Sequence, residues 1–141
     1  MIQRIQTVWL FLAALCAAFT YKFPFYTGNK INTANVQVQT YETLTASSNF
    51  LLLIFTAALT IGAIIIIFLY KNRKQQMWLT VAAAALGIIN IIIYFTELKK
   101  FVSGNMSLTA ILSFAIPIFL VFAVNGIYKD EKLVKSLDRL R

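Results

Sequence analysis

The sequence predicts an all-α membrane protein: a bundle of four transmembrane helices with both termini in the cytoplasm, room for a small β element in the first outer loop, and a cytoplasmic amphipathic C-terminal helix. Of the 141 residues, 60% are hydrophobic and only 13% are charged, whereas a soluble domain is about half apolar and about one quarter charged. Four long apolar runs occupy more than half of the chain. We therefore expect a single membrane domain over residues 1–141.

The four apolar runs predict membrane spans at residues 5–23, 50–70, 77–95 and 108–128. Each of the last three is uncharged over about 20 residues, and a helix of that length reaches roughly 30 Å, the thickness of the hydrocarbon core. The first run is shorter, because Arg4 and Lys22 bound it. A signal peptide is the alternative for this run, but the run lacks an Ala-x-Ala cleavage pair. We therefore expect it to span.

The basic residues predict the orientation of the four spans. An even number of spans places both termini on one side, and nine of the 13 basic residues fall on that side: Arg4, Lys71, Arg73, Lys74, Lys129, Lys132, Lys135, Arg139 and Arg141. The other side carries Lys22, Lys30, Lys99 and Lys100. Since basic residues accumulate in cytoplasmic segments, both termini are expected in the cytoplasm. The net charge of +8 would then face anionic lipid, and no nucleic-acid partner is expected.

The first outer loop, residues 24–48, is too long to be a simple turn. Within it Val36, Val38 and Thr40 alternate with polar or aromatic residues, which is the period-two pattern of a strand. Gly28-Asn29 is a plausible turn before this strand. A loosely ordered polar loop is the alternative. Beside the spans, Ser47-Ser48-Asn49 is expected to cap the second helix, and Asn105 or Ser107 the fourth.

Apart from Lys22 at the end of the first span, the spans carry polar and small residues but no Asp, Glu, Lys or Arg. Ion-coupled transporters place such charges at membrane depth, so a transporter of that kind is not expected. The candidate polar positions are Asn90 and Ser113, which form hydrogen bonds between helices, and Pro117, which kinks the fourth helix and opens a cavity or adjusts packing. Small residues one turn apart predict close helix contacts, within the bundle or between copies, at Ala14 and Ala18, Ala58 and Gly62, and Ala83 and Gly87.

The tail, residues 129–141, carries an amphipathic pattern. Leu133, Leu137 and Leu140 fall on one helical face, and basic residues flank them: Lys129, Lys132, Lys135, Arg139 and Arg141. With a bend at Asn125-Gly126, this segment would lie at the membrane surface, with its leucines among acyl chains and its basic groups among anionic headgroups. Docking to a partner and a solvated continuation of the fourth helix are the alternatives.

The two ends of the chain carry a family resemblance. The opening Met1-Ile2-Gln3-Arg4-Ile5-Gln6-Thr7-Val8-Trp9-Leu10 and the closing stretch from Lys129 to Arg141, KDEKLVKSLDRLR, resemble a family of small uncharacterised membrane proteins of Bacteroidetes, a domain of unknown function. The resemblance implies four helices in a bacterial inner membrane and implies no activity. At this end we also expect Arg4 to meet Asp130, Glu131 or Asp138.

These observations favour a non-enzymatic structural or accessory subunit that contacts another membrane protein or its own copies. Histidine is absent and Cys16 is the single cysteine, so haem ligation, the usual zinc sites and a C-x-x-C pair are not expected, and no cofactor is predicted. The alternative function is a binder or carrier of a lipid-like or apolar ligand, using a cavity near Asn90 and Pro117. An enzyme using Glu97, Lys99 and Lys100 is the least favoured class.

Overall fold

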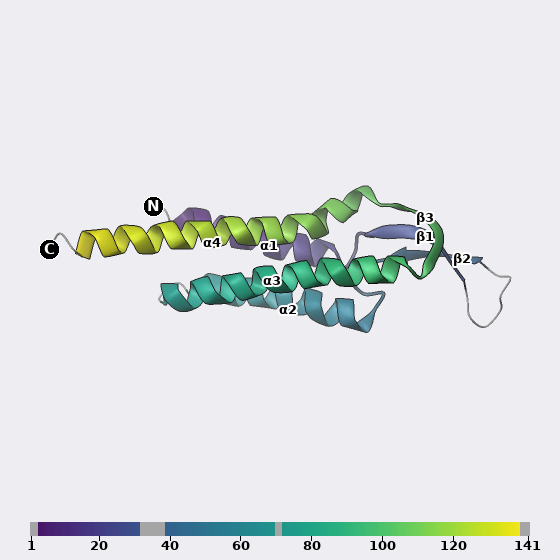
Figure 1. Cartoon of the computed structure of the whole chain (residues 1–141), viewed down its shortest axis with the longest axis horizontal. Helices are drawn as coiled ribbons and strands as arrows, with labels where there is room; N and C mark the ends of the chain where they lie inside the picture. Colours follow the sequence, from purple (N-terminus) through teal and green to yellow (C-terminus); the bar gives the residue numbers. More distant parts are fainter. Residues whose placement is uncertain (1–2, 32–38, 70–71, 139–141) are drawn as a thin grey trace.

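The structure, a computed structural model, describes residues 3–31, 39–69 and 72–138. Figure 1 shows an elongated bundle in which both termini, the end of α2 and the start of α3 lie at one end, and the strands lie at the other. We name these the terminal end and the sheet end. In chain order the elements are α1 (Gln3–Phe19), β1 (Tyr26–Ile31), β2 (Gln39–Leu44), α2 (Phe50–Phe68), α3 (Arg73–Leu98), β3 (Phe101–Met106), a 3-10 turn (Leu108–Ala110) and α4 (Ile111–Asp138).

The four predicted helices are present, and three of them are long and apolar enough to cross a membrane: Phe50–Phe68, Arg73–Leu98 and Leu108–Val134. The first helix is shorter, because its apolar part ends at Phe19 and the chain then turns. The first span was predicted to reach residue 23. Backbone hydrogen bonds of a turn replace the helix there, from Tyr21 N to Ala18 O at 3.3 Å and from Lys22 N to Phe19 O at 3.0 Å.

The helices pack in a ring in which α1 contacts α2, α2 contacts α3, α3 contacts α4, and α4 returns to α1. Each contact except the last joins neighbours in the sequence. The core at the centre of this ring is built mainly from small and branched residues, which are Leu10, Ala13, Ala17, Leu59, Ile66, Ala83, Ala84, Ile116, Leu120 and Ala123. The alanines of α1 let the neighbouring backbones approach closely, as is typical of helices packed in membranes.

The sheet has the strand order β2-β1-β3, and both pairings are antiparallel. A strand in the first loop was predicted, and β2 confirms it, although Val36 and Val38 lie outside the described residues. The predicted turn at Gly28-Asn29 is wrong, since both residues lie inside β1, where Gly28 faces Glu42 of β2 and Gly104 of β3. The third strand, β3, comes from the connection between α3 and α4, for which no strand was predicted.

Gly28 is glycine because two strands approach closely at this point. A Cβ built on Gly28 would lie 2.9 Å from the Cα of Gly104, and a Cβ on Gly104 would lie 2.6 Å from the Cα of Gly28. The ring of Tyr26 lies within 3.1 Å of the first of these positions. A glycine in a strand interior often marks such a close backbone approach, and here it was misread as a turn.

The sheet is attached to the helices through a second apolar cluster. Its buried members are Phe25, Leu44, Leu52, Tyr94 and Ala110. Phe25 stacks on Tyr94 with ring centroids 4.4 Å apart, while its backbone N donates to the carbonyl of Leu44 at 2.7 Å and its carbonyl accepts from Ser107 N at 3.1 Å. Phe25 therefore joins the sheet, α3 and the start of the last helical segment.

Two predicted helix caps are confirmed. The side chain of Asn49 accepts a hydrogen bond from Leu51 N at 3.1 Å at the start of α2. The side chain of Ser107 accepts from Thr109 N at 3.4 Å and begins the 3-10 turn before α4. Both caps satisfy amide groups that the first turn of a helix leaves free.

The predicted bend at Asn125-Gly126 is wrong, because α4 runs unbroken from Ile111 to Asp138. Figure 1 shows its last turns projecting beyond the other three helices in line with the middle of the helix. Gly126 instead permits close contact with α1, since a Cβ there would lie 2.8 Å from the Cγ of Gln6. In place of the bend, α4 continues as one helix as far as Asp138.

The glycine pair of the sheet gives a direct test of this packing. We expect Gly104→Ala to lower the free energy of unfolding by about 1–3 kcal/mol, because the new methyl group would collide with the backbone of β1. The matched control is Gly62→Ala on α2, where a Cβ meets nothing within 4 Å, so stability should stay the same or rise by up to about 1 kcal/mol. Denaturant titration followed by circular dichroism measures both. Equal losses in the two variants would contradict the close strand approach.

Candidate functional site

Each of the four helical segments contributes a buried polar side chain to one region of the bundle, which we name the polar layer. Its members are Thr20 directly after α1, Thr56 of α2, Asn90 and Tyr94 of α3, and Ser113 of α4, and none is more than 3% exposed. Asn90 Nδ2 donates to Thr56 Oγ1 at 3.2 Å. The sequence had placed Asn90 and Ser113 inside the spans, and the structure brings them into the same layer.

Two atoms of the polar layer have no protein hydrogen-bond partner in the part of the chain that the structure describes: Asn90 Oδ1 and the hydroxyl of Tyr94. The side chains of Thr20, Thr56 and Ser113 lie near that hydroxyl, although none meets the geometric criteria for a hydrogen bond with it. The layer contains amide and hydroxyl groups alone, so it is suited to holding helices together and not to proton transfer or ion coupling.

Pro117 lies inside α4 and faces Gly87 of α3, one of the small residues predicted to form a helix contact. A Cβ built on Gly87 would be in ordinary contact with Pro117, 3.6 Å from its Cβ, and 3.7 Å from Cγ2 of Ile116. The predicted pair Ala83 and Gly87 is buried, so it forms the contact between α3 and α4. At this level the two helices leave room for a methyl group beside Gly87, and neither of the described pockets is lined by Asn90 or Pro117.

The other two small-residue pairs behave differently. On α1, Ala14 is buried and Ala18 is exposed, because the inward face is shifted by one residue to Ala13 and Ala17, each 1% exposed. On α2 the predicted pair Ala58 and Gly62 faces outward.

Ala58 is exposed, and the Cα of Gly62 has open space beside it. We name these two residues the α2 outer seam. Of the three predicted small-residue contacts, the one on α3 lies inside the bundle as expected. The contact on α1 lies inside the bundle in a register shifted by one residue. The pair on α2 has no neighbour beside it among the described residues.

At the terminal end the first and last helices are joined by a buried hydrogen bond. Gln6 Nε2 donates to Asp130 Oδ2, and the two residues are only 5% and 6% exposed. The sequence hypothesis paired Asp130 with Arg4, whose side chain lies outside the described part of the chain. The signal in the sequence was the spacing of Gly126 and Asp130, which are one helical turn apart on α4. Both residues face Gln6 in the structure.

Beside this hydrogen bond a groove of about 510 Å³ runs between α1 and α4. We name it the terminal groove, and its lining residues are Ile5, Gln6, Trp9, Phe122, Asn125, Gly126 and Lys129. Trp9 packs against Phe122 and Phe119, with ring centroids 5.2 Å and 5.8 Å away. Of these residues, Lys129 alone was a predicted site residue, because the groove depends on the packing of two helices that are distant in sequence.

The described side chains of the tail extend to Val134. Lys129, Lys132 and Leu133 are exposed, with Leu133 48% exposed. The side chains of Lys135 and Leu137 lie outside the described part, as do residues 139–141 with Arg139, Leu140 and Arg141. The apolar stripe predicted for the tail is therefore described at Leu133 alone.

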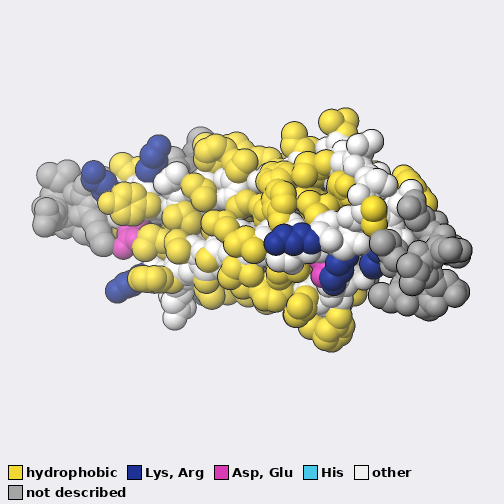
Figure 2. Space-filling model, turned by 45° about the vertical axis from the view of Figure 1, so that its right-hand side comes forward, with side chains coloured by type: hydrophobic (Ala, Val, Ile, Leu, Met, Phe, Trp, Pro, Cys, Tyr) yellow, Lys and Arg dark blue, Asp and Glu magenta, His cyan; other side chains and the backbone are white. Residues whose placement is uncertain are grey.

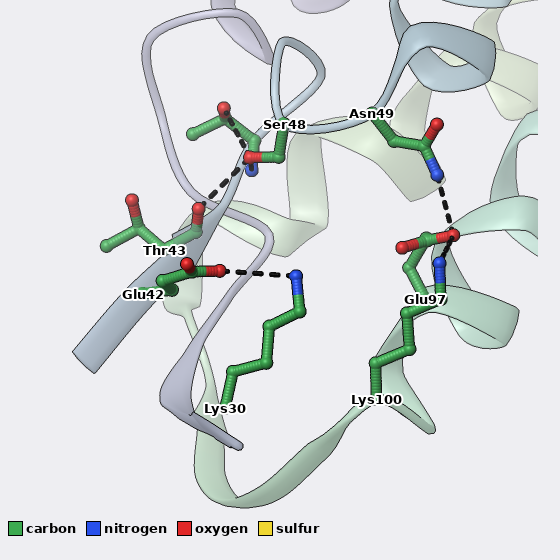
Figure 3. A network of polar contacts seen from close by, with 8 residues as sticks. Lys30, Glu42, Thr43, Ser48, Asn49, Glu97 and Lys100 are labelled. Carbon is green, nitrogen blue, oxygen red and sulfur yellow. Dashed lines mark hydrogen bonds and ion pairs between the residues drawn. The ribbon is translucent and has the colours of Figure 1, made fainter. Parts of the chain in front are cut away.

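A polar network closes the sheet end, and Figure 3 shows it from close by. Glu97 accepts hydrogen bonds from Asn49 Nδ2 at 2.6 Å and from Lys100 Nζ at 2.7 Å. Lys30 pairs with Glu42 at 3.3 Å across β1 and β2. Glu97 thus joins the start of α2 to the end of α3, a structural task for a carboxylate that the enzyme hypothesis had considered as a reactive group.

The described residues include no group of three or more His, Cys, Asp or Glu side chains placed to hold a metal ion. The surface is mainly apolar, and Figure 2 shows hydrophobic side chains over most of the visible face, with Lys and Arg to either side of a central uncharged region. The polar chemistry of the described part is concentrated in the polar layer, at the terminal groove and at the sheet end.

Fold and surface together define a helical bundle with three helices long and apolar enough to cross a membrane, closed at one end by a three-stranded sheet. The chain belongs to the family described as Domain of unknown function (DUF4293), whose sequence profile matches residues 2–140. The resemblance to an uncharacterised family is thereby confirmed, whereas an origin in Bacteroidetes stays a prediction. Searches of curated proteins and of solved structures found no match to this chain.

The buried bond between Gln6 and Asp130 gives a second test. We expect Gln6→Leu to lower the free energy of unfolding by about 1–3 kcal/mol, because it leaves a buried carboxylate without its donor. The double variant Gln6→Leu with Asp130→Leu should regain most of this loss, since both partners become apolar. Gln75→Leu, at an exposed position of α3, is the matched control and should stay within about 0.5 kcal/mol of the parent. Additive losses in the double variant would contradict the pairing.

Proposed function

We propose that this chain is a non-enzymatic structural or accessory subunit of a bacterial inner-membrane assembly, with both termini in the cytoplasm. The observation that carries the proposal is the α2 outer seam, a small-residue pair on the outward face of α2 in which Ala58 is exposed and Gly62 is half-buried. Ala58 is exposed and a Cβ on Gly62 would meet nothing within 4 Å. The partner would be a second membrane protein whose helix packs on this face.

The physical reason lies in how helices associate in lipid. Because lipid tails are as apolar as leucine, association gains little from the hydrophobic effect and depends on close packing, for which small residues are needed. A lipid-facing helix has no need of such a pair, and the neighbouring exposed positions Ile61, Ile64 and Ile65 carry large side chains. The contrast between these isoleucines and the adjacent seam supports a helix partner over lipid at this face.

The projecting end of α4 offers the partner a second point of contact. Tyr128, Leu133 and Val134 are exposed apolar or aromatic side chains on it, at 59%, 48% and 39%, and Lys129 and Lys132 are exposed beside them. A straight helix that leaves the bundle along its long axis (Figure 1) moves away from the membrane plane when the bundle spans the membrane. This geometry favours docking to a protein over lying flat on lipid.

Orientation is testable with reporters. Because nine basic residues lie in the terminal segments and the α2–α3 connection against four elsewhere among the 13, a fluorescent protein fused to the C-terminus should fold and fluoresce in the cytoplasm. An alkaline phosphatase inserted after Ser47 should be active, since that enzyme requires the oxidising outer compartment. An active phosphatase at the C-terminus would overturn the proposed orientation.

The subunit role is tested by gentle extraction of the tagged full chain, followed by mass spectrometry of proteins that copurify in stoichiometric amounts. Gly62→Leu projects into open space on the outer face of α2, so we expect it to fold normally and to lose at least about tenfold of the partner, which corresponds to about 1.4 kcal/mol. Ala82→Leu, a similar enlargement at an exposed position of α3, is the matched control and should retain the partner.

Two results would contradict this assignment. Retention of the partner at parental levels in Gly62→Leu would exclude the seam as the contact. Efficient disulfide crosslinking of Ala58→Cys to its own copies, in a Cys16→Ser background, would replace the heterologous partner with a homo-oligomer, since Cys16 is the single native cysteine.

A further inference from the structure

We propose that the terminal groove binds one anionic phospholipid, with the headgroup phosphate at Lys129 and one acyl chain along Trp9 and Phe122. This inference goes beyond the subunit role and does not depend on it. It requires only that the bundle be embedded in a membrane. The groove lies on the outside of the bundle between α1 and α4, so a lipid enters it laterally from the bilayer.

The main observation is that the α4 wall of the groove changes polarity along its length. On α4 the lining residues run from Phe122 through Asn125 to Lys129, toward the terminal end. On α1, which runs the opposite way, Trp9 lies deeper, and the buried Gln6 and the exposed Ile5 lie nearer the same end. The groove is thus aromatic at depth, and its α4 wall carries an exposed amide further out and an ammonium group at the mouth.

This order matches a phospholipid oriented as it lies in a leaflet. An acyl chain contacts the aromatic level, the ester and glycerol groups meet the exposed amide of Asn125, and the phosphate meets an ammonium group. Tryptophan is typical of the membrane interface because it combines an apolar ring with one donor. A purely apolar ligand would leave Asn125 and Lys129 without partners, and a soluble anion would leave the aromatic level empty.

The size and exposure of the groove agree with a lipid occupant. Gly126 forms part of its lining, and its volume of about 510 Å³ lies within the range of ligand sites. Phe122 is 47% exposed and Asn125 and Lys129 are exposed, so these groups face the surroundings and not the bundle core.

The charges around the groove favour an anionic headgroup. Lys129 is exposed at the mouth, while the adjacent Asp130 is turned into the bundle, where its carboxylate accepts from Gln6. The carboxylate therefore lies on the inner side of α1 and α4 and the ammonium group on the outer side. A zwitterionic lipid would also present a phosphate, but its own cation would compete with Lys129, so phosphatidylglycerol is preferred over phosphatidylcholine.

The chain provides a local probe of this site. Trp9 and Trp78 are the two tryptophans, and Trp78 is 66% exposed on another helix, so Trp78→Phe leaves Trp9 as a reporter inside the groove. This variant is reconstituted into phosphatidylcholine vesicles that contain a small, fixed share of either brominated phosphatidylglycerol or brominated phosphatidylcholine. We expect the brominated anionic lipid to be preferred at Trp9 by about fivefold, the factor given by about 1 kcal/mol for one lysine near an anionic lipid.

Lys129→Gln should remove this preference. The matched control is Lys74→Gln, because Lys74 lies at the same end beside Gln75 and Trp78 on the exposed face of α3 alone, and it should leave the preference unchanged. Circular dichroism of each variant verifies the fold. Equal quenching by the two brominated lipids would overturn the proposal, as would equal loss in the two lysine variants, which would indicate general surface charge.

Discussion

The contact between α1 and α4 is the interaction on which the rest of the architecture depends. Among the described residues it is the most extensive contact between helices, it joins elements that are not neighbours in the sequence, and it closes the ring of four helices. At the terminal end it is secured by the buried hydrogen bond from Gln6 to Asp130, which Gly126 permits by having no side chain. At the other end, β1 follows α1 and β3 precedes α4, so the pairing of β1 with β3 continues the same contact as a sheet.

Small residues lie both at the internal helix contacts of this bundle and on its outward face. Gly87 meets Pro117 between α3 and α4, and Ala13 and Ala17 bring α1 against its neighbours. Ala58 and Gly62 have the same spacing but face outward. The spacing of small residues therefore identifies positions suited to close contact, and the position of each face around the ring decides whether these residues pack within the bundle or face outward.

The sequence was informative where the signal is local and uninformative where it depends on pairing across the chain. Uninterrupted apolar runs identified the long helices, and Asn49 and Ser107 identified two of their starts, because length and capping are properties of short segments. Gly28 and Gly126 were misread as a turn and a bend. Both are glycines required by a distant partner, Gly104 and Gln6 respectively, and no local pattern distinguishes that requirement from a turn. The third strand and the terminal groove were missed for the same reason.

Because of the sheet, the two ends of the bundle are held together by different kinds of bond. Its backbone hydrogen bonds join the α1–α2 connection to the α3–α4 connection, so all four helices are fastened together there by main-chain bonds that no side-chain rotation can release. The opposite end is held by side chains such as Gln6 and by the short connection between α2 and α3. We therefore expect the helices to separate more readily at the terminal end, which carries the groove, than at the sheet end.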